Sequence, residues 1–414
     1  MSLEEARQAI VNKDLALAEA TYTHILTQKT DDSKLAQQQE LAAMELGKLY
    51  RDNQKTEQLV ALIAQARANL GALAKSKMAK ILKLLIEMLN DLPNALDLQI
   101  QATKESIEWA LEQKLSFLRQ TLQLKLAALL FTKTHYSESV AILSALLSEY
   151  KKLDDKSSLV EVQLLEAKNY HALRNLAKAR ASLTSARTSA NSIFCPTLTQ
   201  AELDCMSGIL NAEDKDYKTA FSYFYEAFEG FHAQNDGRAV AVLKYMLLSK
   251  IMLNLIDEVN ALLGNKNVVK YTNREIEAMK AVATAYSNRS LKEFETALSV
   301  YGAELKSDQI IRSHFSDLYD TLLEQNLVKV IEPFSTVEID HIAKVIGLDI
   351  KQVEGKLSQM ILDKVFYGVL DQGNGWLVIY DKPRTDATYA ASLDIMKSLS
   401  SAVDLLYEKA ATLN

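Results

Sequence analysis

A pattern of large, small and large residues recurs over the first three quarters of the chain, at intervals of about 40 residues. In each copy a small residue follows a large one after three positions, and a second large residue follows after seven. The clear copies are Leu15, Ala18 and Tyr22; Tyr136, Ser139 and Leu143; Leu176, Ala179 and Leu183; Tyr217, Ala220 and Phe224. Two further copies have a bulkier middle residue: Ile256, Val259 and Leu263; Leu291, Phe294 and Leu298. A copy at Lys55, Gln58 and Leu62 is weak, and the copy expected near residue 95 is not evident.

An amphipathic stretch precedes each clear copy, as in "LVEVQLLEAKNYHALRN" and "QAELDCMSGILNAEDKD". A pair of helices cannot bury its apolar face alone, so repeated pairs stack into a solenoid, and small residues let crossing helices approach closely. The pattern predicts an all-α, tetratricopeptide-like helical-repeat solenoid over residues 1–304. The period exceeds the 34 residues of the tetratricopeptide consensus, and the Trp, Leu-Gly and terminal Pro signatures are absent, so the similarity lies in the architecture.

Glycine and proline mark a change of fold near residue 330. The 414 residues include only 12 Gly and 4 Pro, which indicates helix along most of the chain. Five of the glycines fall between residues 347 and 375, and Pro333 and Pro383 bracket that stretch. A small mixed module therefore follows the solenoid.

Residues 335–381 have the layout of a winged helix. Ser335 and Glu338 stand at capping-box spacing, which predicts a helix that begins there and ends at Gly347. One face of that helix carries apolar residues at positions 339, 342, 343 and 346. Asp349 is expected to cap a second helix, and two apolar runs then flank a loop from Asp371 to Gly375 with hairpin chemistry.

Charge argues against nucleic-acid binding by this module. It holds four Lys, no Arg and seven Asp or Glu, a net charge of minus three, whereas a protein that binds a phosphate backbone needs several cations facing it. The whole chain has a formal net charge of −6. We expect a winged helix that packs against proteins, with no nucleic-acid partner.

Catalytic and cofactor motifs are missing from the sequence. There is no HExxH, GxSxG or Walker A segment, and the six His are scattered singly without partners for a metal site. The two Cys are too few for a disulfide scaffold. No apolar run approaches the length of a membrane span, and the amino terminus lacks a signal-peptide pattern. We expect no enzyme activity, no cofactor and no membrane contact, in a cytoplasmic and nuclear protein.

Aromatic residues crowd one stretch of the solenoid and leave two interpretations open. They could form a partner surface, or they could be core. They are Tyr217, Phe221, Tyr223, Phe224, Tyr225, Phe228 and Phe231.

The segments "YDTLLEQNL", "IEPFS", "KLSQMILDK" and "LDQGNG" resemble the PCI family, which is shared by the proteasome lid, the COP9 signalosome and translation initiation factor three. The similarity is strongest over residues 305–414 and is closest to a 26S proteasome lid subunit. The alternative is a scaffold subunit of the COP9 signalosome, which shares parts of "LLEQNL" and "IEP". The resemblance implies a PCI helical linker and winged helix over 305–382 and a C-terminal bundle helix over 383–414.

The resemblance also implies a function and partners. A member of this family would be a non-catalytic scaffold that contacts other lid PCI subunits, an ATPase-ring subunit and an outer-ring subunit of the core particle, and so bridges the regulatory particle to the core. Its winged helix would pack side by side with others. The corresponding residues are Phe366, Val369, Trp376, Val378 and Tyr380.

The last 26 residues, "YAASLDIMKSLSSAVDLLYEKAATLN", form a heptad pattern when Tyr389 is taken as an a position. The winged helix is complete at Tyr380 and does not need this segment for its core. We therefore expect the seam to bury its apolar residues against other helices. The alternative is that this helix packs back onto its own domain. The predicted interface residues are Met396, Leu399, Val403, Leu406 and Leu413.

Overall fold

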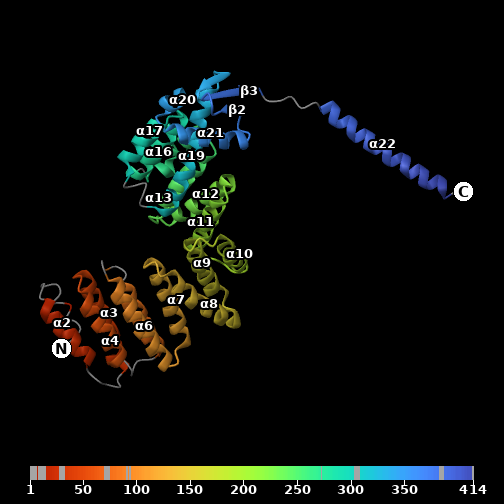
Figure 1. Cartoon of the computed structure of the whole chain (residues 1–414). Helices are drawn as coiled ribbons and strands as arrows, with labels where there is room; N and C mark the ends of the chain where they lie inside the picture. The colour runs from red at the N-terminus through yellow and green to blue at the C-terminus, as the bar shows by residue number, and fades with distance from the viewer. Residues whose placement is uncertain are drawn as a thin grey trace. The chain divides into compact units, whose positions relative to one another are not determined.

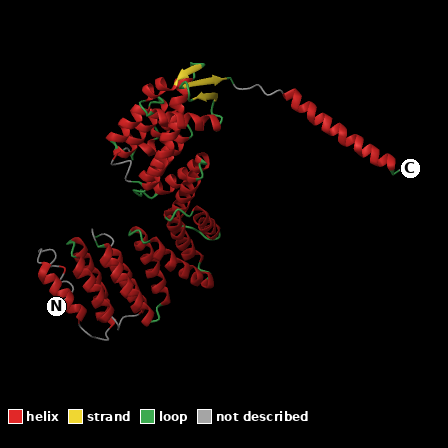
Figure 2. Cartoon of the chain, viewed as in Figure 1, coloured by secondary structure: helices red, strands yellow, loops and turns green. Residues whose placement is uncertain are grey.

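The computed structural model describes residues 7, 15–27, 33–69, 75–89, 92, 95–271, 273–302, 308–381 and 387–412. Helices dominate these residues, and three short strands precede the last helix in the chain (Figure 2). The chain forms two compact units, Met1–Met246 and Leu247–Asn414. The domain boundaries predicted at residues 304 and 382 both fall in segments outside the described residues.

The first unit is a stack of helices that lie side by side in chain order (Figure 1). The helices are α2 (Leu15–Thr27), α3 (Ser33–Asp52), α4 (Thr56–Asn69), α5 (Lys75–Met88), α6 (Leu96–Glu112), α7 (Ser116–Thr132), α8 (Tyr136–Leu153), α9 (Lys156–Ala172), α10 (Leu176–Asn191), α11 (Thr197–Glu213), α12 (Tyr217–Ala233) and the start of α13 (Ala239–Met252). From α6 onward the described connections are short turns, so consecutive helices run antiparallel.

The large-small-large pattern marks the second helix of each pair. Its first residue opens that helix, and its small residue is fully buried at Ala18, Ser139, Ala179 and Ala220. Small residues at these positions allow the close helix crossing that the sequence predicts.

Two copies of the pattern need correction. The weak copy is displaced by one residue, because Gln58 is exposed whereas Leu59 and Ile63 are fully buried. The copy that was not evident begins at Leu96, the first residue of α6, and its inner positions are the buried polar residues Gln99 and Thr103. Gln99 Nε2 donates to the Ile86 carbonyl at 3.4 Å, and Thr103 Oγ1 donates to the Gln99 carbonyl at 2.6 Å. Hydrogen bonds thus satisfy polar groups where the other copies have apolar contacts.

Residues other than glycine make the turns between helices, which explains how so helical a chain needs few glycines. In the described residues, nine helices end in a left-handed residue whose amide donates to the carbonyl three positions earlier, and the next amide donates five positions back. The residues are Gln54, Lys114, Thr134, Arg174, Lys215, Asn235, Asn254, Arg289 and Lys364. In several cases the following residue, such as His135 or Asp216, is already the N-cap of the next helix, so the turn has minimal length.

A series of ion pairs joins side chains 34 to 39 residues apart, which is about one repeat. The six pairs named below have N–O distances from 2.5 to 3.3 Å, and they connect matching positions of adjacent helix pairs. The pairs include Glu19 with Lys55, Glu40 with Lys77, Arg67 with Glu105, Glu87 with Lys125, Lys168 with Glu202, and Arg174 with Glu213.

The second unit continues with helices and ends in the winged module. After the rest of α13 come α14 (Ile256–Leu263), α15 (Lys266–Val269), α16 (Arg274–Ser287), α17 (Leu291–Val300), α19 (Gln309–Ile331), β1 (Thr336–Glu338), α20 (Ile339–Ile346), α21 (Ile350–Leu362), β2 (Tyr367–Asp371), β3 (Trp376–Tyr380) and α22 (Ala387–Ala411). The strands form one antiparallel sheet in the order β1-β3-β2. The predicted winged helix is present.

The predicted capping box at Ser335 and Glu338 is wrong. Residues 336–338 form β1, which pairs with β3, and the Ser335 carbonyl accepts a hydrogen bond from the Ile379 amide at 2.8 Å. The helix begins one residue after Glu338, which makes no side-chain cap bond. Asp349 does precede the second helix, also without a side-chain cap bond, and Gly347 ends the first helix with a φ of 85°.

Candidate protein interfaces

The sheet of the winged module has one buried and one open face. Leu377 on β3 is paired with Val337 on β1 and with Leu370 on β2, so the three share one face of the sheet. Val337 and Leu377 are buried there. Because side chains alternate along a strand, the residues between them point to the opposite side. We call this side the outer face; it carries Thr336, Glu338, Tyr367, Val369, Asp371, Trp376, Val378 and Tyr380.

Four of the five predicted wing residues lie on the outer face. Val369, Trp376 and Tyr380 are 53%, 50% and 55% exposed, and Val378, paired with Val369, is half-buried. Phe366 precedes β2 and has the opposite parity, so alternation does not place it with them. Sequence reasoning missed Tyr367, although strict alternation from Val369 would have found it.

An aromatic and aliphatic surface on a three-stranded sheet is suited to packing against another apolar surface. Trp and Tyr give a large contact area at low entropic cost, and they are enriched in protein interfaces. β2 is also an edge strand, since β3 is the one strand among the described residues that pairs with it. The structure therefore supports the outer face as a protein contact, and its occupancy stays a prediction.

The positive charge of this module is partly neutralised within the chain. Lys356 on α21 contacts Glu324 at 2.9 Å and Asp320 at 3.8 Å, both on α19. Two neighbouring carboxylates offset the positive potential of the ammonium group, so its attraction for a phosphate is weak. This contact strengthens the sequence argument against nucleic-acid binding by α21.

The final helix α22 is exposed on all sides. Every described side chain from Thr388 to Thr412 is exposed, and the predicted seam residues Met396, Leu399, Val403 and Leu406 are between 57% and 67% exposed. Leu413 lies outside the described residues. No described residue covers the seam, and its burial against helices of other chains stays a prediction.

Apolar residues also flank the seam on α22. With Tyr389 at position a, the e and g positions include Leu393, Ile395 and Tyr407, which are likewise exposed. A stripe that spans e, a, d and g is wider than the a and d seam of a two-helix coiled coil. A stripe of this width would suit contacts with more than one neighbouring helix.

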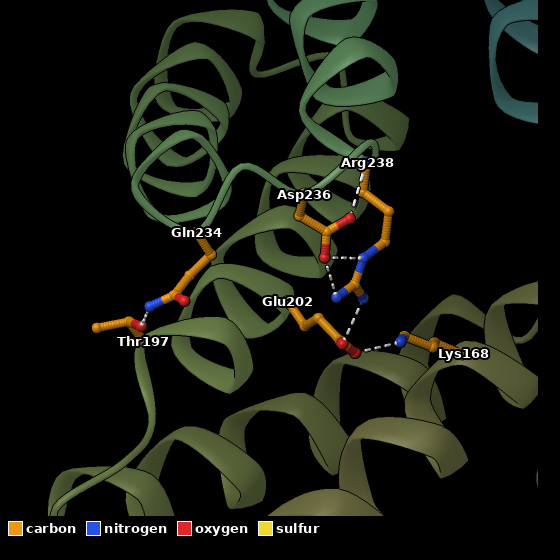
Figure 3. Close-up of polar contacts among 6 residues, drawn as sticks. All are labelled: Lys168, Thr197, Glu202, Gln234, Asp236 and Arg238. Carbon is orange, nitrogen blue, oxygen red and sulfur yellow. Dashed lines mark hydrogen bonds and ion pairs between the residues drawn. The ribbon is translucent and has the colours of Figure 1, made fainter. Parts of the chain in front are cut away.

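A polar cluster ties three elements of the solenoid together (Figure 3). Glu202 on α11 accepts from Lys168 on α9 at 2.7 Å and from Arg238 at 2.5 Å. Arg238 also binds Asp236 through two nitrogens at 3.0 and 2.8 Å, and its guanidinium lies over the Phe231 ring. Burial raises the pKa of Glu202, but its two cationic partners outweigh burial and hold the pKa below its ordinary value.

The aromatic stretch on α12 is mainly core. Tyr217, Phe224, Phe228 and Phe231 are buried, and Tyr223 lies under the guanidinium of Arg187. Among the seven aromatic residues, Tyr225 is exposed and Phe221 is half-buried. These contacts favour packing over a partner surface.

The described residues include no group of three or more His, Cys, Asp or Glu placed to hold a metal ion. A search of the same residues finds no helix long and apolar enough to cross a membrane.

Family models match three parts of the chain. Residues 1–133 match the 26S proteasome regulatory subunit RPN6 N-terminal domain, residues 285–381 the PCI domain, and residues 385–411 the 26S proteasome subunit RPN6 C-terminal helix domain. The chain is 54% identical to 26S proteasome regulatory subunit RPN6 of Saccharomyces cerevisiae, over 99% of this chain and 98% of the relative. It is 50% identical to the probable 26S proteasome regulatory subunit rpn6 of Schizosaccharomyces pombe, with the same coverage, and 45% identical to 26S proteasome non-ATPase regulatory subunit 11 of Dictyostelium discoideum, over 99% of each chain. With its winged helix and its final helix both in place, the chain belongs to the RPN6 family of PCI-domain proteins.

Proposed function

We propose that this chain is a non-catalytic scaffold subunit of the 26S proteasome lid, which supports lid assembly and bridges the regulatory particle to the core particle during ubiquitin-dependent degradation. The observation that carries the proposal is similarity from end to end to relatives named as regulatory subunits of the 26S proteasome. The match includes the final helix, which has no cover in the described chain.

Two surfaces would join the lid in this proposal. The outer face, with Trp376 and Tyr380 exposed, would contact the winged helix of a neighbouring PCI subunit. The wide apolar stripe of α22 would enter a bundle of helices from several subunits. Both surfaces are apolar and open, as surfaces that become buried on assembly should be.

The bridging role would belong to the solenoid. Each helix pair contacts mainly its neighbours, so a stack of pairs can extend away from the assembled lid without a second core. We assign to its amino-terminal part, which matches a domain of its own, the contacts with an ATPase-ring subunit and a core-particle outer-ring subunit.

Three further parts of the proposal concern chemistry and location. The scaffold would carry no catalytic activity of its own and would bind no nucleic acid, in keeping with the acidic winged module and its neutralised Lys356. It would work in the cytoplasm and the nucleus. Fluorescence microscopy of the tagged chain would test the location.

Substitution of the α22 seam tests the proposal directly. Leu399→Asp with Leu406→Asp places two charges where the bundle would be dry, so we expect the variant to stay out of the lid. The matched control is Ser398→Asp with Ser401→Asp, which adds the same two charges on the polar side of the same helix. Affinity purification of the lid with mass spectrometry gives the readout. Normal incorporation of the seam variant would refute the role of α22, and recovery of signalosome subunits with the unaltered chain would favour the COP9 alternative.

A further inference from the structure

The loop between β2 and β3 contains the one Asn-Gly sequence of the chain, Asn374-Gly375. Both residues lie in the turn that follows Asp371, where Asn374 is exposed and Gly375 is half-buried with a φ of 70°. A Cβ built at Gly375 would meet no atom within 4 Å, so the space around this glycine is open. An asparagine followed by an unshielded glycine in an exposed turn has the chemistry of a self-modifying site.

We propose that Asn374 is a site of spontaneous deamidation that opens the turn of the wing. The Gly375 amide nitrogen attacks Cγ of Asn374, and a carbon–nitrogen bond forms as the bond from Cγ to the side-chain nitrogen breaks. The leaving nitrogen takes the proton that Gly375 loses and departs as ammonia. Water then opens the cyclic imide at either carbonyl, which gives isoaspartate or aspartate. The reaction needs only water as a co-reactant.

The Gly375 amide nitrogen can reach Cγ of Asn374 because few contacts hold the Asn374 side chain. Its side-chain nitrogen donates to Asp371 Oδ2 at 2.9 Å, and the residue is exposed. The Asn374 amide also donates to Asp371 Oδ1 at 3.3 Å, but the side chain itself has only the one exposed hydrogen bond, which contributes little net stability and opens readily to water. Elsewhere the sequence offers Asn191-Ser192, where Asn191 is the last residue of α10 and its backbone is helical. Helical geometry and the serine Cβ both hinder ring closure there.

Deamidation would remove the donor that organises the turn. Asp371 accepts from the side chain and amide of Asn374 and from the Gly373 amide, and these bonds hold the pKa of Asp371 below its ordinary value. A carboxylate at position 374 has no N–H to donate and would face the Asp371 carboxylate. Two neighbouring carboxylates repel each other.

The consequence reaches beyond the loop. The Gly375 carbonyl accepts from the Ile339 amide at 2.9 Å, at the start of α20, and the next residue is Trp376 on the outer face. Isoaspartate adds one carbon to the main chain between Asp371 and Trp376, which are paired in the sheet. The modification therefore loosens the turn beside the outer face.

Peptide mapping of the aged full-length chain tests the site. The protein is held in mildly alkaline buffer, and peptides from successive times are examined by mass spectrometry and by methylation with protein isoaspartyl methyltransferase. Because glycine lacks a shielding Cβ, we expect conversion at Asn374 to be about tenfold faster than at Asn191. A synthetic peptide of residues 365–381 serves as the unfolded reference. If Asn374 keeps its amide while the peptide is converted, folding protects the site and the proposal is wrong.

Amide hydrogen exchange tests the opening of the turn. After ageing, the Gly373 and Asn374 amides should exchange faster than in fresh protein, because their acceptor has been disrupted. The Asn374→Gln variant, whose longer side chain closes a ring far more slowly, should keep its exchange rates under the same treatment. Equal exchange in fresh and fully converted protein would refute the effect on the turn.

Discussion

Helices α12 and α22 have similar apolar content but differ in how far their apolar side chains are buried. In α12 the large side chains Phe224, Phe228 and Phe231 are buried, whereas the corresponding stripe of α22 is exposed along its whole described length. The difference lies in what faces each helix. Gly208 on α11 lets Phe224 approach so closely that a Cβ there would stand 2.6 Å from its ring. An amphipathic sequence shows that a helix must pack against something. Small residues on a neighbouring helix, such as Gly208 on α11, show that the packing partner belongs to the same chain.

Phe224→Ala should give the largest effect. Removing a buried aromatic side chain opens a cavity beside Gly208, and we expect a loss of about 3–5 kcal/mol in the free energy of unfolding. Denaturant unfolding followed by circular dichroism measures it. Tyr225→Ala, the exposed neighbour on the same helix, is the control and should change the stability by less than about 1 kcal/mol. Equal losses would show that α12 is not packed as the comparison requires.

Glu202→Gln should give a smaller, pH-dependent effect. The variant removes the charge that Lys168 and Arg238 share, and we expect a cost of about 1–2 kcal/mol at neutral pH. The pKa of Glu202 is lowered on folding, so its contribution is complete above the ordinary value of 4.5 and is lost as the pH falls through the folded value.

The difference in stability between the parent and the Glu202→Gln variant should therefore shrink on acidification. Thermal unfolding at a series of pH values measures it. Asp97→Asn, in a far more exposed pair with Lys133, should show no comparable loss at neutral pH. A difference that stays constant through the acid range would rule out the ion pairs as its cause.

Thr134→Gly should stabilise the protein. Thr134 is β-branched and holds a φ of 68° at the turn after α7, where glycine adopts the same conformation without strain. After the entropic cost of glycine is subtracted, we expect a gain of about 0.5–1 kcal/mol in the free energy of unfolding. Ala181→Gly, at an exposed position inside α10, should lose about 1 kcal/mol, so the same kind of change has opposite signs at the two sites.

Leu399→Ala with Leu406→Ala should have the smallest effect on the isolated chain. Both side chains are exposed on α22, so we expect the free energy of unfolding to change by less than about 0.5 kcal/mol. Leu143→Ala, at a fully buried position of the repeat pattern, should cost about 2–5 kcal/mol in the same assay. A large loss from the α22 pair would mean that the helix packs within its own chain, and the contrast with α12 would fail.

The solenoid could be predicted because small residues must lie at its helix crossings, and their spacing from large residues is visible within a short stretch of sequence. The copy at Leu96 escaped detection because Gln99 and Thr103 satisfy their polar groups by hydrogen bonds, which an apolar pattern cannot reveal. The left-handed turns escaped for a related reason. Residues such as Lys114 and Thr134 carry no glycine signal, and their conformation is imposed by the helices on both sides.

The winged module shows where local signals end. Ser335 and Glu338 satisfy the spacing of a capping box, yet residues 336–338 pair with β3, about 40 residues later in the chain. That pairing decides the structure, and no local rule contains it. The same alternation that assigned Val369 and Trp376 to one face would have separated Phe366 from them, but the start of β2 had to be known first.

The ion pairs one repeat apart have a mechanical meaning. Inside the first unit, stacked apolar layers resist separation, whereas the half-buried ion pairs between helix pairs contribute less and are partly screened by salt. The apolar layers thus give the stack most of its stiffness, and the ion pairs add a smaller part. That smaller part decreases as ionic strength rises. A connector of this kind can hold two large bodies together while they shift against each other.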